Sequence, residues 1–485
     1  MPEFNTRATE PFPREPGVAM RSRVRALLAV LVVEDGAVLT APDGHLLSLT
    51  VNGVETGSVL DGTYGTTTLI AAGTYRGDIV LTPALEHTET FAGATFHRGR
   101  LTHAWARDVS LSSTGEAFNG CYAAEGASYT LTRPRITFDG NGRCDFTTYG
   151  ANVIVKNSRI RTREGRLPDD VLGENTSATI TGDSGYGTYA DGGSQTDLFL
   201  GTHFDVATFA AISTGGSVTF ADSTREAVVA LDSELDLGLT ARESDAIGPR
   251  ASIVESRGCG VMWHSGDGGS VDIGGGTRFS TAGTMFLDKA KQVTVTVDGS
   301  QGARLHTGNG VLVQVMETDD PGSPDGVCTE PTGDPDKDDT FDPTTVHTTD
   351  ATASFTDIEL KGDFYNAMRT GKNLVLSFAR TRPAGVVSAS ASRHAVSSIS
   401  AANHEQINHL TNTTRPAIDN GVIVTLGAGS AWTVTGKSYL TRLVVDTDAT
   451  VQAPPGRTLS PSVDGAVTTL APGSTYSGAL TLTVA

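Results

Sequence analysis

The segment Gly283–Val315 reads GTMFLDKAKQVTVTVDGSQGARLHTGNGVLVQV and contains the pattern that decides the fold. Short alternating runs such as QVTVTVDG, which begins at Gln292, are separated by glycine-rich turns. Alternation places successive side chains on opposite faces of a strand, so that one face can be buried while the other meets water. The segment therefore predicts short β-strands that share an interior.

Similar segments recur along the chain with glycine-rich punctuation: Phe209–Gly215, Val228–Asp232, Gly260–His264, Gly283–Asp288 and Gly310–Val315. Where the series is clean, successive segments start about two dozen residues apart, a period typical of solenoids. A single coil cannot bury its own apolar face, so neighbouring coils have to stack. An antiparallel sandwich is the structural alternative, but Asn-Gly hairpin signals between matched strands are sparse. We therefore expect an all-β chain that forms a right-handed parallel β-helix.

The composition agrees with stacked strands and narrows the range of partners. The 485 residues include 56 Gly, and only 6% are aromatic, which favours short strands and tight turns over helices around an aromatic core. The 36 Lys and Arg against 55 Asp and Glu give a formal charge of -19. We expect no binding to nucleic acid or to anionic lipid, because phosphate would be repelled by such a surface.

The two ends of the chain carry related sequences. Leu31–Val54 and Leu443–Ala466 match without a gap, and each is followed by a second match, GTYRGDIVLT from Gly73 and GSTYSGALTLT from Gly473. Open strand edges at the ends of a solenoid need capping units. We expect these parts along the chain: a disordered leader over 1–25, an N-terminal β module over 26–84, coils over 85–318, an acidic projecting loop over 319–350, further coils over 351–440, and a C-terminal β module over 441–485.

The apolar run Ala26–Val33 follows three arginines and has the outline of a signal peptide. It is too short to cross a bilayer, which takes about 20 apolar residues. Because the same segment recurs near the C-terminus, we interpret it as a strand and expect no transmembrane segment.

Gly421–Val445, with the sequence GVIVTLGAGSAWTVTGKSYLTRLVV, resembles the end of a pertactin-type autotransporter passenger. The residues that carry the resemblance are Trp432, Val434, Gly436, Ser438, Leu440 and Leu443. More broadly, Tyr129–Val396 is similar to secreted bacterial β-helix proteins, some of which are adhesins and others polysaccharide lyases or glycoside hydrolases. The resemblance implies a solenoid and a secreted or cell-surface location, whereas a shared fold does not carry a reaction with it.

The strongest candidate site combines an aromatic side chain with carboxylates on neighbouring coils. Trp263, His264 and Asp267 precede Asp288 by about one coil, and Lys289 and Lys291 follow it. Stacked coils bring equivalent positions to about 4.8 Å from one another. We expect His264, Asp267 and Asp288 as catalytic residues, and Trp263, Lys289 and Lys291 as ligand-binding residues, of a sugar site. The alternative is a surface histidine beside a solvated turn.

A second cluster contains Arg133, Arg135 and Asp139, with Asp145 and Lys156 nearby in sequence. Arginine and lysine beside carboxylates suit the recognition of an acidic sugar. The competing interpretation is that these are solvated turn residues, since Asp139 opens the turn sequence DGNG.

Two further expectations concern a metal and a disulfide. Asp334, Asp336 and Asp338 alternate in the acidic loop and could bind calcium, which prefers oxygen ligands; otherwise the loop is disordered and no cofactor is expected. Cys121 and Cys144 lie about one repeat apart and could form a disulfide on adjacent coils, the alternative being two buried thiols.

Two functions follow from these observations. The first is an extracellular, rod-like, adhesin-like protein that binds glycan or a surface ligand. The second is a hydrolase or lyase of polysaccharides or oligosaccharides that uses carboxylates on adjacent coils. An isomerase or cyclase of small molecules on this scaffold is a third reading, and a homo-oligomer is compatible with the fold.

Overall fold

The computed structural model describes residues 24–40, 45–51, 54–55, 58–60, 67–69, 73–85, 103–113, 119–124, 128–132, 135–138, 144–149, 152–156, 159–162, 186–191, 196–223, 250–263, 268–317, 349–369, 371–395, 409–418 and 420–485. Every regular element among these residues is a β-strand, which confirms the all-β prediction. The chain divides into two compact units, an N-terminal unit that ends at Glu255 and a C-terminal unit that comprises Ser256–Ala485.

The C-terminal unit is built from parallel strands that pair at a constant interval along the chain. Its first strands are β20 (Cys259–Trp263), β21 (Gly268–Ile273), β22 (Arg278–Thr281), β23 (Phe286–Asp288), β24 (Gln292–Asp298) and β25 (Arg304–Thr307). Each strand of the first three pairs in parallel with the strand three places later: β20 with β23, β21 with β24, and β22 with β25. One coil therefore supplies one strand to each of three series of paired parallel strands.

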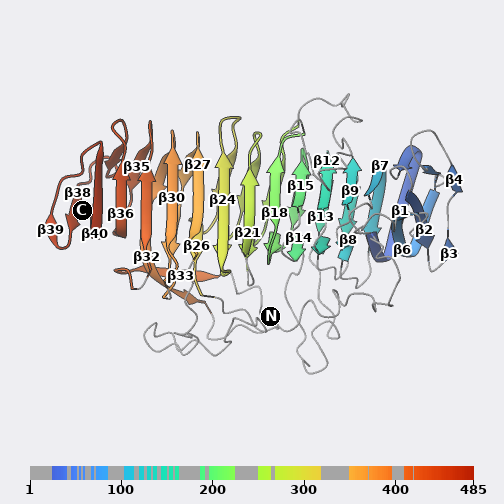
Figure 1. Cartoon of the computed structure of the whole chain (residues 1–485), viewed down its shortest axis with the longest axis horizontal. Coiled ribbons are helices and arrows are strands. Elements are labelled where there is room, and N and C mark those ends of the chain that lie inside the picture. Colours follow the sequence, from blue (N-terminus) through green and yellow to red (C-terminus); the bar gives the residue numbers. More distant parts are fainter. Residues whose placement is uncertain are drawn as a thin grey trace, which may run out of the picture. The chain divides into compact units, whose positions relative to one another are not determined.

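The same interval continues towards the C-terminus through β26 (Val311–Val315), β27 (Ala351–Thr356), β28 (Glu359–Lys361), β29 (Asp363–Asn366), β30 (Leu374–Ala379), β31 (Arg382–Gly385) and β32 (Val387–His394). Figure 1 shows β21, β24, β27 and β30 side by side, in the order in which they pair. A hairpin partner, β33 (Leu410–Thr414), runs antiparallel to β32. The last parallel strands are β34 (Val422–Leu426), β35 (Ala431–Val434), β36 (Ser438–Val445) and β37 (Thr450–Gln452).

The core of this unit is formed by alternate side chains that stack from one coil to the next. Phe355 of β27 lies directly opposite Phe378 of β30, and their rings stack at a centroid distance of 5.6 Å. Phe364 of β29 meets both rings edge-on. Such aromatic pairs contribute about 0.5–1.5 kcal/mol each beyond the burial of their area.

The N-terminal unit repeats this plan with β8 (Asn119–Ala124), β9 (Ser128–Thr132), β10 (Arg135–Phe138), β11 (Cys144–Tyr149), β12 (Asn152–Lys156), β13 (Arg159–Thr162), β14 (Tyr186–Asp191), β15 (Thr196–Leu200), β16 (His203–Val206), β17 (Phe209–Ser213), β18 (Ser217–Ala221) and β19 (Ile253–Ser256). The pairs β11–β14, β12–β15 and β13–β16 are parallel and keep the three-strand interval. Phe199 stacks on Phe220 at 5.5 Å, and Phe204 packs edge-on against both, so this unit has its own aromatic core.

Buried hydroxyl groups close an equivalent corner of the coil in each unit. In the N-terminal unit the Ser252 Oγ accepts a hydrogen bond from the Thr202 N–H at 3.1 Å and donates one to the Ala221 carbonyl at 2.6 Å. In the C-terminal unit the Ser430 Oγ accepts from the Thr381 N–H at 3.3 Å and donates to the Phe378 carbonyl at 3.0 Å. These bonds satisfy backbone groups that the sharp corner would otherwise leave buried and unpaired.

The sequence repeat at the two ends has a structural counterpart. Near the N-terminus β1 (Val24–Thr40) pairs antiparallel with β6 (Gly73–Leu85), and β6 with β2 (His45–Val51). In the C-terminal unit β36 pairs antiparallel with β40 (Ser474–Val484), and β40 with β38 (Leu459–Val463). Matching residues have matching partners, because Leu31 lies opposite Tyr75 and Leu443 lies opposite Tyr476.

Short strands complete the two end modules. They are β3 (Val54–Glu55), β4 (Ser58–Leu60), β5 (Thr67–Leu69) and β7 (His103–Ser113) near the N-terminus, and β39 (Ala466–Val467) near the C-terminus. The hairpins β2–β3 and β38–β39 again agree in register, since Val51 faces Val54 and Val463 faces Ala466.

The segment that carries the passenger resemblance lies in the last parallel strands. The side chains of Trp432, Val434, Ser438, Leu440 and Leu443 are all buried. The Trp432 indole N–H donates a 3.1 Å hydrogen bond to the Gly385 carbonyl of the neighbouring coil. Among the described residues there is no helix with the length and apolar character needed to span a membrane.

Candidate functional site

Two residues of the strongest predicted site lie side by side in the C-terminal unit. Trp263 is the last residue of β20, Asp288 is the last residue of β23, and the two are directly paired across these strands. Both side chains point into the interior and are 0% and 2% exposed. The buried Trp263 Nε1 has no hydrogen-bond partner in the part of the chain that the structure describes. The stacking expected from the sequence is present, and it places these two side chains inside the coil.

The Asp288 carboxylate forms an ion pair with Lys372, a residue that the sequence analysis did not identify. The Lys372 Nζ lies 2.6 Å from the Asp288 Oδ2, and it also donates a hydrogen bond to the Ala290 carbonyl at 2.7 Å. The Asp288 Oδ1 accepts a 3.0 Å hydrogen bond from the Ala290 N–H. The Lys372 side chain is fully buried, so both charges are shielded from water and each is held by more than one partner.

Asn366 occupies the position of β29 that is equivalent to Asp288 of β23, with Val315 of β26 between them in register. Its Oδ1 accepts a hydrogen bond from the Met368 N–H at 3.0 Å, which repeats the bond between Asp288 and Ala290. Its Nδ2 donates to the carbonyls of Lys372 at 3.0 Å and Gly421 at 2.9 Å. This corner of the coil is therefore closed twice by an Asx-type turn, with Lys372 linking the two coils.

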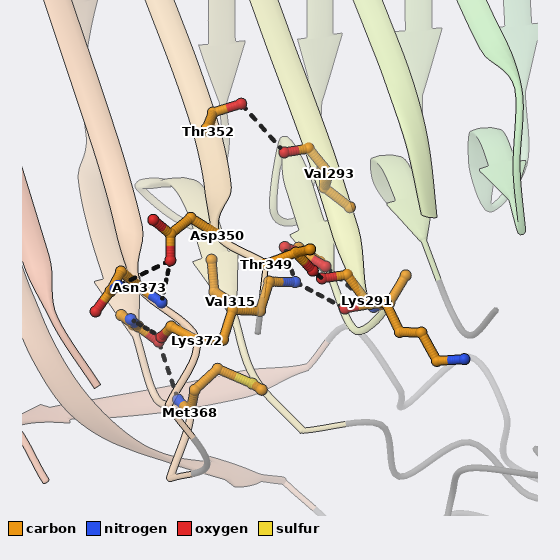
Figure 2. A network of polar contacts seen from close by, with 12 residues as sticks. Lys291, Val293, Val315, Thr349, Asp350, Thr352, Met368, Lys372 and Asn373 are labelled. Atoms are coloured by element: carbon orange, nitrogen blue, oxygen red, sulfur yellow. Dashed lines mark hydrogen bonds and ion pairs between the residues drawn. The ribbon is translucent and has the colours of Figure 1, made fainter. Parts of the chain in front are cut away.

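Figure 2 shows how this network extends to the start of the next strand. The Asp350 Oδ1 accepts hydrogen bonds from the backbone N–H and the Nδ2 of Asn373, at 3.2 and 2.8 Å. The Thr349 hydroxyl donates to the Lys291 carbonyl at 2.8 Å. Most of these bonds join different coils, so the arrangement holds the coils in register.

The other groups near Asp288 differ in accessibility. Lys289 is buried and has interactions of its own, whereas Lys291 is exposed at the turn before β24. Cys259, at the start of β20, is a free and buried cysteine. Burial raises the pKa of the Cys259 thiol far above its ordinary value, which favours the protonated thiol.

Several predicted site residues lie outside the described residues: His264, Asp267, Arg133, Asp139, Asp334, Asp336 and Asp338. A catalytic role for His264, Asp267 and Asp288, and calcium binding by the acidic loop, therefore stay predictions. Among the residues described, no group of three His, Cys, Asp or Glu side chains is placed to hold a metal ion.

The two cysteines of the predicted disulfide lie on neighbouring parallel strands, β8 and β11. Cys121 is paired with Phe146, and Cys144 is paired with Asn119. A disulfide needs Cα atoms within about 7 Å, which is shorter than the diagonal between positions two residues out of register. The disulfide stays a prediction that would require a shift of this register.

A row of polar side chains runs along the outer face of the C-terminal unit, where the middle strand of each coil meets water. The pairing of β21, β24, β27, β30 and β34 places these residues in one column: Asp272, Thr296, Ser354, Ser377 and Thr425. All are exposed or half-buried, while their neighbours in sequence are buried. The hydroxyls of Thr296, Ser354, Ser377 and Thr425 make no hydrogen bond to the described residues. We call this column the hydroxyl ladder.

A shorter column lies beside the hydroxyl ladder on the same strands. Ser270, Thr294 and Thr352 are in register, and the Thr352 hydroxyl donates to the Thr294 hydroxyl at 3.1 Å. The Thr352 hydroxyl also lies 3.4 Å from the Val293 carbonyl (Figure 2). The outer face thus presents one column in which two hydroxyls, those of Thr352 and Thr294, bond to each other, and one whose hydroxyls make no hydrogen bond to the described residues.

Comparison of the chain with models of known protein families, with curated proteins and with solved structures finds no significant match.

Proposed function

We propose that the chain is a secreted or cell-surface right-handed parallel β-helix that binds glycan, or another surface ligand, in an adhesin-like role. The three-strand interval of parallel pairing within each unit supports the fold part of the proposal. The location outside the cell rests on the similarity to secreted β-helix proteins.

The hydroxyl ladder is the observation that carries the binding role. Its members repeat once per coil, about 4.8 Å apart, on the flat outer face of a parallel sheet. A ligand with hydroxyl groups that repeat along its length can form similar hydrogen bonds at successive coils. Each bond contributes only about 0.5–1.5 kcal/mol, so a useful affinity requires several coils to be engaged at once.

The enzyme hypothesis requires a carboxylate that can reach a substrate. Asp288 is buried and its Oδ2 is bonded to Lys372, so a substrate would have to displace an internal ion pair. Binding without turnover therefore has the better support from the described residues.

A binding assay with the whole protein tests the proposal. We expect retention on an insoluble or immobilised polysaccharide, and a clear loss of retention in a variant that combines Thr296→Val, Ser354→Ala and Thr425→Val. These changes remove three of the four free hydroxyls and leave Ser377 in place. Thr450→Val, at an exposed position of β37, is the matched control and should bind like the parent. Failure of the parent protein to bind any member of a broad panel of glycans and matrix proteins would refute the binding role.

A further inference from the structure

A second column of polar side chains, on the third strand of the coil, differs from the hydroxyl ladder in its charge. Arg278 of β22 lies directly opposite Arg304 of β25, and both side chains are exposed. Two residues further along the same strands, Ser280 lies opposite His306, which is also exposed. Three basic side chains thus lie together on the outer surface of two neighbouring coils.

This pairing is unfavourable for the protein taken by itself. Like charges that lie directly opposite on neighbouring strands destabilise a sheet. The chain has 55 acidic residues, any of which would be a more favourable neighbour for an arginine than a second arginine is. At the same position of the next two coils opposite charges do meet, since Glu359 lies opposite Arg382 on β28 and β31. Arg278 and Arg304, in contrast, form no ion pair with any described residue.

The N-terminal unit places basic residues at the same position of its coils. Arg159 of β13 lies opposite Arg135 of β10 on one side and His203 of β16 on the other. Arg161 is paired with Thr137 and Asp205 in the adjoining column. Basic residues thus recur at the first residue of the third strand in both units, and the His203 Nε2 lies 3.0 Å from the Glu255 Oε2.

We propose that this column, which we call the basic ladder, recognises the carboxylate or sulfate groups of an acidic polysaccharide. The guanidinium group binds such anions through two parallel hydrogen bonds, and an anion between Arg278 and Arg304 would offset their mutual repulsion. Ser280 lies two residues after Arg278 on β22, and its hydroxyl can form a hydrogen bond with a sugar hydroxyl. The inference rests on the proposed glycan-binding function and specifies the ligand as an acidic one.

A polysaccharide fits the basic ladder better than a nucleic acid or a membrane does. A nucleic-acid duplex and an anionic membrane both present a wide surface of negative charge, which a protein with a formal charge of -19 repels. A single acidic chain that follows one column avoids the acidic remainder of the surface.

The test measures binding of the full-length protein to polygalacturonate and dextran sulfate, with neutral dextran for comparison, at several salt concentrations. The variant combines Arg278→Gln and Arg304→Gln. Its matched control combines Arg393→Gln and Arg457→Gln, which removes two exposed arginines at other positions and changes the net charge equally. Circular dichroism verifies that both variants keep the parent fold.

We expect salt-sensitive binding to at least one acidic polysaccharide, weakened about tenfold or more in the Arg278 and Arg304 variant and little changed in the control. Unchanged affinity in that variant, or equal binding of neutral dextran, would overturn the inference and leave the proposed function standing. If no glycan of any kind binds, both fail. If single-stranded DNA or vesicles of phosphatidylserine bind and the same variant loses that binding, the basic ladder serves another class of partner and the polysaccharide assignment is wrong.

Discussion

At the scale of single residues, the buried ion pair between Asp288 and Lys372 is expected to have a large effect on the free energy of unfolding. Removing two charges from water costs several kcal/mol per ion, and the cost is recovered only when every group is well bonded. Here the Lys372 ammonium has two oxygen partners, and the Asp288 carboxylate accepts from Lys372 and from the Ala290 backbone. If one of the two side chains were replaced, the other would remain as a buried charge with no ion-pair partner.

We expect Lys372→Met to lower the free energy of unfolding by about 3–5 kcal/mol, because it leaves the Asp288 charge buried and unpaired. Combining Lys372→Met with Asp288→Leu should recover most of the loss, since no charge then remains in the interior. Chemical denaturation measures both. Lys361→Met, at an exposed position of β28, is the control and should have little effect. A double variant that is less stable than the single one would show that the pair is not the main source of the penalty.

At the scale of the strand, the short corners between consecutive strands of a coil depend on residues with a left-handed backbone conformation. Asp357 and Arg380 are each the first residue of a two-residue corner, between β27 and β28 and between β30 and β31, with φ of 52° and 50°. Gly201 does the same between β15 and β16 with φ of 60°. A non-glycine residue in this left-handed region is strained, and aspartate is among the side chains that tolerate it better.

A bidentate ion pair links the two strained corners. The Arg380 Nε and one Nη each donate a 2.7 Å hydrogen bond to a carboxylate oxygen of Asp357. This hydrogen bonding lowers the pKa of Asp357 below its ordinary value of 3.8. The stabilisation that comes with the lowered pKa is therefore fully present above pH 3.8 and is lost as the pH falls through the folded-state pKa.

We expect a double-mutant cycle of Asp357→Asn and Arg380→Gln to show favourable coupling at neutral pH that disappears in acid. Asparagine is a suitable replacement because it also accepts the left-handed conformation. Thermal unfolding across a pH series measures the coupling, and raised salt should weaken it because the pair is exposed. Coupling that persists unchanged in acid would mean that the carboxylate charge is not its source.

At the scale of the whole molecule, each end module protects the edge of a parallel sheet. In the C-terminal unit β36 pairs in parallel with β34 on one side and antiparallel with β40 on the other. The side chains of Leu480 and Leu482 of β40 are buried there. Without β40, β36 would present an unpaired edge to solvent, and such edges promote pairing between molecules.

We expect a chain that ends at Val445 to self-associate more strongly than the full chain, because β36 loses its antiparallel partner. Size-exclusion chromatography with light scattering measures the change in mass. Val467→Ser is the control: this side chain is 86% exposed, and the change leaves the module in place. An unchanged mass after truncation would mean that the module does not protect this edge.

The sequence by itself determined the class of the fold and the repeat at the two ends. Alternation in short runs such as Val293–Val297 is a local property, since the backbone sends successive side chains to opposite faces whatever lies nearby. The match between Leu31–Val54 and Leu443–Ala466 likewise requires only comparison within the chain, and the shared register of the two modules agrees with it. The spacing of about one coil also predicts that Trp263 and Asp288 lie on neighbouring strands, and the two residues are directly paired.

Only the tertiary structure decided what those side chains meet. Lys372 lies 84 residues after Asp288, between β29 and β30 of a later coil, and reaches it because the coils stack, which no local pattern reveals. The pairing of Arg278 with Arg304 depends on register between coils, because a shift by one residue would turn both side chains to the opposite face. Charged residues that form a buried ion pair and charged residues of an exposed ladder have the same appearance in the sequence. They differ only in whether the side chain points into the interior or towards solvent.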